Sequence, residues 1–85
     1  MTKFNYTITD EYGIHARPAG LLVKEAEKFE SNISINLMDN TADAKRIFSI
    51  MSLGVKQGDI IEITIDGPDE EKAKNAIEQF LSTNL

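Results

Sequence analysis

The chain has no cysteine, no tryptophan, one histidine and two prolines in 85 residues. Without cysteine it forms no disulfide and offers no thiolate metal site, and one histidine is too few for a histidine cluster, so we expect no bound metal. No apolar run approaches the ~20 residues that a membrane span requires, and no signal-peptide pattern opens the chain. We therefore expect a cytoplasmic protein that does not insert into a membrane.

The net charge is −5, and it is spread unevenly along the chain. Residues 1–57 carry seven Lys or Arg and seven Asp or Glu, whereas residues 58–85 carry two lysines and seven acids. This acidic balance argues against nucleic acid as a main partner. The first part nevertheless holds cations that we expect to form a basic group near the single histidine and to attract acidic partners: Arg17, Lys24, Lys45, Arg46 and Lys56.

Alternation of apolar and polar residues predicts the strands. They cover residues 3–9, 32–37 and 59–66, with a short strand near 41–44. The pair Asp39-Asn40 is typical of a turn, which predicts a hairpin between the second strand and the short one.

Apolar residues at helical spacing predict two long helices and a short one. The first has the stripe Ala19, Leu22, Val23, Ala26 and Phe29. The last begins at Gly67-Pro68-Asp69-Glu70, with proline in its first turn, and has the stripe Ala73, Ala76, Ile77, Phe80 and Leu81. A short helix at about 47–53 ends at Gly54. The order β-α-β-β-α-β-α favours an α+β sandwich, and the pattern alone leaves a ferredoxin-like arrangement open.

The run Gly13-Ile14-His15-Ala16-Arg17-Pro18-Ala19 is the chemically informative motif. Pro18 suits the first turn of a helix, so His15 lies at or just before the helix N-terminus. A neutral imidazole is a nucleophile near pH 7, and the first turn of a helix offers unpaired N–H groups and a positive dipole end. With Arg17, these groups suit the acceptance and holding of a phosphoryl group. The alternative is that the histidine only caps the helix or is an ordinary surface residue.

The short helix is apolar on two sides. Ile50 and Leu53 can enter the core, while Ile47, Phe48 and Met51 share another face. So small a domain cannot bury both faces, which predicts an exposed apolar patch for partner proteins. The alternative is that Ile47 or Phe48 packs against the first long helix.

The sequence resembles the HPr family, the histidine-containing phosphocarriers of the bacterial phosphoenolpyruvate:sugar phosphotransferase system. The resemblance rests on Gly13–Ala19, Ile50-Met51-Ser52-Leu53-Gly54-Val55, Gly58-Asp59-Ile60 and Gly67–Glu70. It extends over essentially the whole chain, which we expect to be one domain of residues 1–85. It implies an open-faced β-sandwich, in which three helices lie on one face of a four-stranded antiparallel sheet.

The resemblance also implies a function. His15 would accept a phosphoryl group on Nδ1 from enzyme I and pass it to enzyme IIA domains for sugar uptake, with no cofactor and without acting as an enzyme. Arg17 would be its electrostatic partner, and Ala16 and Arg17 would bind the phosphate. The partner surface would comprise Gly20, Lys24, Arg46, Ile47, Phe48 and Met51, on a chain expected to be monomeric.

Two positions depart from the family pattern. Arg46 stands where many members carry a regulatory serine, so phosphorylation at that position is chemically impossible. Ser49 and Ser52 lie nearby but do not match the position. Gly20 stands where many members have Thr, Ser or Ala, and we expect it to weaken the exposed face of the helix by up to about 1 kcal/mol.

Two alternative functions remain open at this point. One is a regulatory paralogue or nitrogen-system carrier of the same fold, which acts by binding regulatory or other partner proteins. The other is a small ligand-binding α+β domain whose histidine is structural. Acid-labile phosphorylation of the single histidine separates a carrier from a binder.

Overall fold

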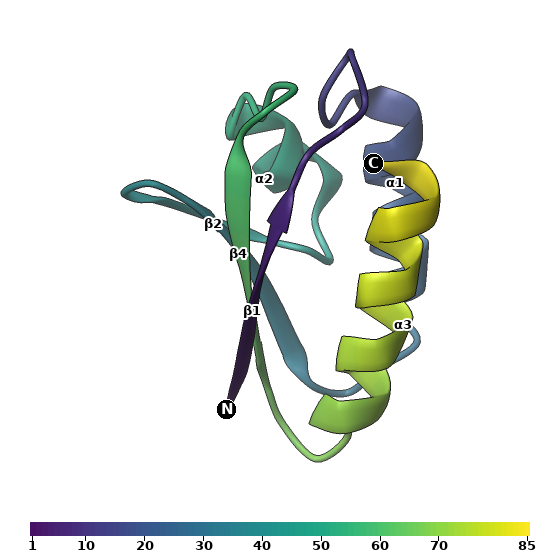
Figure 1. The fold of residues 1–85 in the computed structure, drawn as a ribbon. Coiled ribbons are helices and arrows are strands. Elements are labelled where there is room, and N and C mark those ends of the chain that lie inside the picture. The colour runs from purple at the N-terminus through teal and green to yellow at the C-terminus, as the bar shows by residue number, and fades with distance from the viewer.

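The computed structural model describes residues 1–85, which form one sheet covered by three helices (Figure 1). The elements are β1 (Thr2–Thr7), α1 (Ala16–Ala26), β2 (Asn32–Leu37), β3 (Asn40–Asp43), α2 (Ile47–Ser52), β4 (Ile60–Asp66) and α3 (Glu70–Asn84). The strands are all antiparallel, in the order β1-β4-β2-β3. The predicted open antiparallel sheet is confirmed. A ferredoxin-like arrangement is excluded by the strand order, because in that fold the third strand lies between the first two, whereas here β4 lies between β1 and β2.

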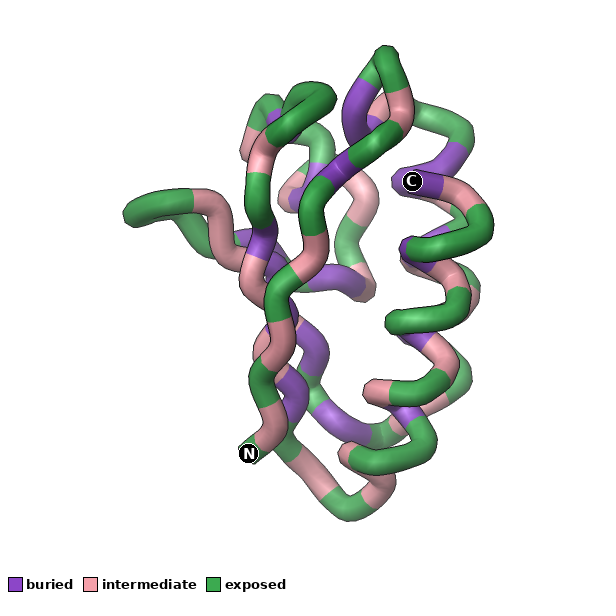
Figure 2. The backbone as a smooth tube through the Cα atoms, in the orientation of Figure 1, coloured by how far each residue is buried: buried purple, intermediate pink, exposed green.

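The core lies between the sheet and the helices. Alternate strand residues point into it, so buried and exposed positions alternate along the strands (Figure 2). Ile63 in the central strand β4 lies opposite Phe4 on one side and Ile35 on the other. From the helices, the buried residues include Ala19, Leu22, Ala26, Ala73, Ile77 and Leu81. The predicted helix stripes therefore face the core, while Val23, Phe29, Ala76 and Phe80 are half-buried at its margin.

The predicted element ends differ from the structure by a few residues. β1 ends at Thr7 instead of residue 9, although the Ile8 N–H still donates to the Asp59 carbonyl at 2.9 Å. α2 ends at Ser52, and Gly54 follows in the left-handed conformation at φ 65°, as predicted for its C-terminal stop. None of the helices combines the length and apolar character needed to cross a bilayer.

The turn of the β2–β3 hairpin lies one residue earlier than predicted. Leu37 pairs with Asn40, so the turn residues are Met38 and Asp39, and the prediction of Asp39-Asn40 is wrong. The same register places Ala42 opposite Ile35 in the buried face. Burial of this pair outweighs local turn preference, because a shift by one residue would turn Ala42 outward. The cost is a positive φ of 55° at Met38, which a side chain disfavours by about 1 kcal/mol.

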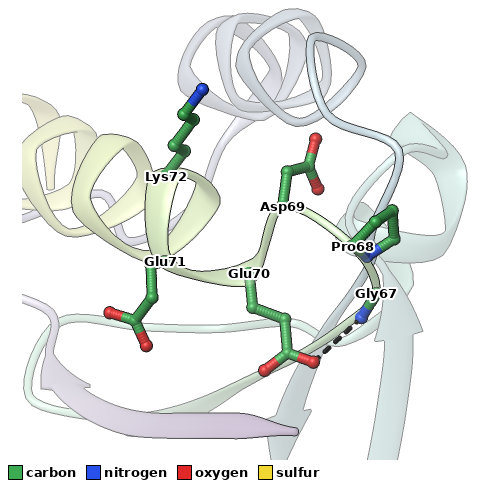
Figure 3. A pocket seen from close by; sticks show the side chains of 6 residues that line it. All are labelled: Gly67, Pro68, Asp69, Glu70, Glu71 and Lys72. Atoms are coloured by element: carbon green, nitrogen blue, oxygen red, sulfur yellow. Dashed lines mark hydrogen bonds between the residues drawn. The ribbon is translucent and has the colours of Figure 1, made fainter.

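The start of α3 is tied to the loop before β2. Asp69 is the N-cap residue of α3, so Pro68 precedes the helix and does not lie in its first turn as predicted. The Asp69 carboxylate accepts hydrogen bonds from the N–H groups of Glu30 and Ser31, each at 2.9 Å, and from the Ser31 hydroxyl. Glu70 accepts from the Gly67 N–H at 3.1 Å (Figure 3). Of the acidic residues predicted at the positive end of the helix, Asp69 links the start of α3 to the loop before β2, and Glu70 holds the turn at Gly67.

Acid is expected to destabilise the fold through Asp69 and Glu70. The Ser31 hydroxyl holds the pKa of Asp69 below its ordinary value of 3.8, and the Gly67 N–H holds the pKa of Glu70 below 4.5. These folded carboxyls bind protons less readily than the unfolded ones, so the stabilisation is complete above about pH 5, begins to fall near pH 4.5 and 3.8, and is lost as the pH falls through the lower folded pKa values. Urea unfolding between pH 6 and 3 should record this loss, with a flatter profile in Asp69→Asn than in the control Glu71→Gln. Equal slopes in the two variants would contradict the assignment to Asp69.

Candidate functional site

His15 is the N-cap residue of α1, as the motif predicts. Its backbone is extended, with φ −101° and ψ −177°, and its carbonyl accepts the first helical hydrogen bond from the Ala19 N–H at 3.0 Å. Its side chain makes no capping hydrogen bond. The imidazole is therefore free for chemistry, and the N–H groups of Ala16 and Arg17 precede the first residue that can reach an intrahelical carbonyl. Two backbone donors and the positive end of the helix dipole remain available to an anion.

A close backbone contact fixes the loop before His15. Gly13 has φ 66°, and a Cβ atom there would lie 2.2 Å from the Val55 carbonyl oxygen. The Ile14 N–H donates to the same oxygen at 3.2 Å. The segment that follows α2 therefore holds the segment that precedes α1, and the position of the imidazole depends on both.

His15 lies in an open hollow at the N-terminal end of α1. The residues that line it are Asp10, His15, Arg17, Pro18, Leu21 and Asn84. The His15 side chain is 43% exposed, and no carboxylate lies within 4 Å of the Arg17 guanidinium. An unpaired guanidinium next to a half-exposed imidazole suits a transferable anion. By contrast, the hollow at the start of α3 is lined by Asp69, Glu70 and Glu71, whose charges repel anions (Figure 3).

Sequence reasoning missed three residues of this site. Asp10 Oδ1 lies 3.9 Å from His15 Nε2, and the rings of Tyr12 and His15 meet edge to face with centroids 5.8 Å apart. The third is Asn84, at the end of α3. The Asp10 carboxylate accepts from the N–H two residues later, that of Tyr12, and such an Asx turn is recognisable from the sequence. Asn84 carried no such signal, because only the packing of α3 beside α1 brings it to the hollow.

The prediction that Lys45 belongs to a basic group around His15 is wrong. Lys45 Nζ donates to the Phe29 carbonyl at 2.7 Å, just beyond the far end of α1, a helix of 11 residues that is roughly 16 Å long. Arg46 precedes α2 and lies 3.8 Å from Asp43. Lys24 lies eight residues along α1 from its start, and the loop residue Lys56 lies beside Gly13.

The second face of α2 is divided between packing and exposure. Ile47 is half-buried, and its Cδ1 atom lies 3.7 Å from the position of a Cβ on Gly20. Phe48 is 86% exposed and Met51 is 40% exposed. The alternative of packing against α1 therefore holds for Ile47, and the exposed patch consists of Phe48 and Met51. Gly20 lies between the two helices, not on the exposed face of α1 as predicted.

Gly20→Ala is expected to stabilise the protein by about 0.5–1 kcal/mol. Alanine favours a helix interior over glycine by this amount, and its Cβ would meet Ile47 at an ordinary contact distance of 3.7 Å. Urea unfolding of the variant and the wild type at pH 7 measures the difference. Gly20→Leu is the matched comparison, because a side chain too large for this gap should reverse the sign. A loss of stability in Gly20→Ala would show that the helices are closer than described.

The hydroxyls near Arg46 are already engaged. The Asp43 N–H donates to Ser49 Oγ at 3.0 Å, and Ser52 Oγ donates to the Ser49 carbonyl at 2.8 Å. Arg46 itself is exposed and has no hydroxyl. The short helix thus holds two serines in local hydrogen bonds and a cation immediately before its first turn.

Comparison with known proteins gives full-length matches. A family model described as "PTS HPr component phosphorylation site" matches residues 2–83. Phosphocarrier protein HPr of Mycoplasma capricolum is 46% identical over 81 residues, which are 95% of this chain and 91% of that protein. A solved histidine-containing phosphocarrier protein of Mycoplasma is 43% identical with a TM-score of 0.94, covering 96% of this chain and 93% of that one. An HPr dimer from Thermoanaerobacter tengcongensis is 38% identical with a TM-score of 0.77, covering 98% and 95%.

Proposed function

This chain belongs to the HPr family of phosphocarriers of the phosphotransferase system, and we propose that its His15 receives a phosphoryl group from enzyme I and delivers it to enzyme IIA domains. The observation that carries the proposal is a half-exposed imidazole with no side-chain hydrogen bond, beside an unpaired guanidinium and the free amides of a helix start. His15 and Arg17 line one open hollow, and the unpaired amides of Ala16 and Arg17 belong to the same helix start. The protein acts as a carrier and not as an enzyme with its own substrate turnover.

Uptake is a displacement at phosphorus. His15 attacks through a ring nitrogen, by family resemblance Nδ1, while the bond from phosphorus to the donor breaks and its electron pair leaves with the donor. The phosphoryl oxygens then carry negative charge that the Arg17 guanidinium and the N–H groups of Ala16 and Arg17 offset. The two amides are fixed by the backbone of the helix start, so they need little reorganisation when the group arrives.

Discharge requires that the hold on the phosphoryl group stays moderate. The hollow is open and Arg17 is exposed. Arg17 is also the only cation among the residues that line the hollow. Contacts of this kind are weakened by solvent, so the carrier does not trap its cargo. The same open face lets a donor and an acceptor protein approach in turn.

The partner surface in this proposal surrounds the hollow along α1 and α2. Its apolar centre is Phe48 and Met51, because a large exposed ring and a flexible thioether adapt to different partners. The remaining members are Gly20, Lys24, Arg46 and Ile47, of which Gly20 and Ile47 are half-buried. We propose that the protein works as a cytoplasmic monomer, since the surface must be free for successive partners.

Phe48→Ser is expected to weaken binding to enzyme I and enzyme IIA by roughly 5- to 100-fold, the range for losing an aromatic residue at the centre of an interface. Titration calorimetry with each partner measures the effect. Met38→Ser is the matched control, because Met38 is 90% exposed but lies at the tip of the β2–β3 hairpin. Equal loss of binding in both variants would remove Phe48 from the proposed surface.

One experiment tests the function as a whole. The protein is incubated with enzyme I and phosphoenolpyruvate, the modified residue is located by mass spectrometry, and an enzyme IIA domain is then added. We expect one acid-labile phosphoryl group on His15 that moves to the acceptor. Labelling without transfer would favour the regulatory paralogue, and absence of labelling would refute the carrier function.

A further inference from the structure

Asp10 is the carboxylate nearest to the His15 ring, with Oδ1 3.9 Å from Nε2. We propose that Asp10 is a positioning residue that reserves Nε2 of His15 for the proton and so directs the phosphoryl group to Nδ1. The inference rests on the proposed function and assigns a role within it to a residue outside the His-Ala-Arg-Pro motif.

The Asp10 carboxylate is held in place by its own loop. Oδ1 accepts a hydrogen bond from the Tyr12 N–H at 2.8 Å. The Asp10 carbonyl accepts from the Gly13 N–H at 3.0 Å, and the Asp10 N–H donates to the Leu85 carbonyl at 2.9 Å. Main-chain bonds on three sides therefore fix a charge that would otherwise move freely on the surface. A fixed charge can distinguish the two nitrogens of one imidazole.

The distance of 3.9 Å is too long for a hydrogen bond, so Asp10 acts through its charge. A carboxylate beside Nε2 favours a proton on that nitrogen and repels phosphoryl oxygens placed there. Asp10 is the only carboxylate among the residues that line the hollow. Arg17 is the cation of the hollow, Asn84 from α3 is neutral, and Tyr12 presents its ring.

Tyr12 restricts the orientation of the imidazole. The two ring planes meet at 79°, with centroids 5.8 Å apart, an edge-to-face geometry that aromatic rings prefer. Because the Tyr12 N–H also binds Asp10, one short turn supplies both the charge and the neighbouring ring. Asp10 and Tyr12 together present Nε2 to the carboxylate and leave Nδ1 on the other side.

The charge also changes during transfer. When the Nδ1 lone pair forms the P–N bond and the donor bond breaks, the ring keeps its Nε2 proton and becomes cationic. Asp10 stabilises that cation. On discharge the P–N electron pair returns to Nδ1, and a neutral ring leaves with its proton still on Nε2. Asp10 therefore keeps the phosphorylated ring protonated, which is the form that releases phosphate.

The test compares Asp10→Asn with the wild type, because asparagine keeps the oxygen that binds the Tyr12 N–H and removes only the charge. Both proteins are phosphorylated with phosphoramidate, which needs no enzyme I, and nitrogen and phosphorus NMR identify the modified nitrogen. Hydrolysis of the product is then followed from pH 4 to 9. Asp59→Asn is the matched control, since the Asp59 carboxylate also binds a loop N–H, that of Lys56 at 2.8 Å, but does not line the hollow.

We expect Asp10→Asn to form more Nε2 product and to hydrolyse its Nδ1 product roughly 1.5- to 5-fold more slowly on the alkaline side, the size expected for loss of a half-exposed ion pair. The difference should vanish in acid, where the ring is protonated in both proteins. Identical regiochemistry and pH profiles would overturn the proposal. So would an effect of Asp10→Ala that Asp10→Asn lacks, because it would reveal a structural role. Failure of enzyme I to label the wild type would refute the proposed function and leave this comparison valid.

Discussion

His15→Ala is expected to lose all uptake of phosphate from enzyme I and phosphoenolpyruvate while the fold stays intact. His15 is the only histidine in the chain, and the Arg17 guanidinium that also lines the hollow has no lone pair available for attack on phosphorus. Because the ring is half-exposed and makes no hydrogen bond, its removal should change the free energy of unfolding by less than about 1 kcal/mol. Intact-mass spectrometry measures uptake, and urea unfolding measures stability.

Arg17→Glu provides the graded comparison for this result. It keeps the nucleophile and replaces the cation by a like charge, so transfer should slow in both directions without being abolished. Label on His15→Ala, at any residue, would mean that the phosphoryl group is carried elsewhere and that the assignment of His15 is wrong. Unfolded His15→Ala would show instead that the ring supports the loop.

Gly13→Ala is expected to cost roughly 2–5 kcal/mol of stability. The positive φ of 66° disfavours any side chain, and the added Cβ would lie 2.2 Å from the Val55 carbonyl oxygen, a backbone atom that cannot rotate away. The loops before α1 and after α2 would have to separate. The same movement displaces His15, so phosphate uptake and the melting temperature should both fall. Calorimetry measures the melting temperature, and intact-mass spectrometry measures the uptake.

Gly54→Ala separates these two causes. Gly54 has nearly the same φ, 65°, but nothing lies within 4 Å of its would-be Cβ. Its substitution should therefore cost only the conformational part, about 1 kcal/mol, and leave uptake unchanged. If both variants lost the same stability, the contact between Gly13 and Val55 would contribute nothing, and the loop geometry described above would be incorrect.

The parts of the fold that follow from short-range pattern were predictable. Isoleucines at every second position, Ile61, Ile63 and Ile65, predict β4, because a strand buried on one face alternates apolar and polar residues. The hairpin turn was not, since its register is set by the burial of Ala42 opposite Ile35 and not by the turn residues themselves. Sheet order was likewise beyond local pattern, because β1 and β4 pair across more than fifty residues.

The residues of the candidate site, like the elements of the fold, were predictable from the sequence only in part. His15, Arg17 and the helix start lie within one short run, so their proximity follows from the sequence. The expected grouping of Lys45 with them is wrong, because Lys45 donates to the Phe29 carbonyl beyond the far end of α1. Asp10 was overlooked, although its turn is local, because its importance lies in where its oxygen meets the His15 ring.

Because the hollow around His15 is open, a phosphoryl group held there would be exposed to hydrolysis by water. Water reaches a phosphoryl group held there as easily as an acceptor protein does, since no lid or enclosing wall covers His15 and Arg17. The lifetime of the loaded carrier is then finite, and the yield of delivery depends on how quickly it meets an acceptor. Under the proposed function, a cell with few acceptors would lose phosphate through hydrolysis of the loaded carrier.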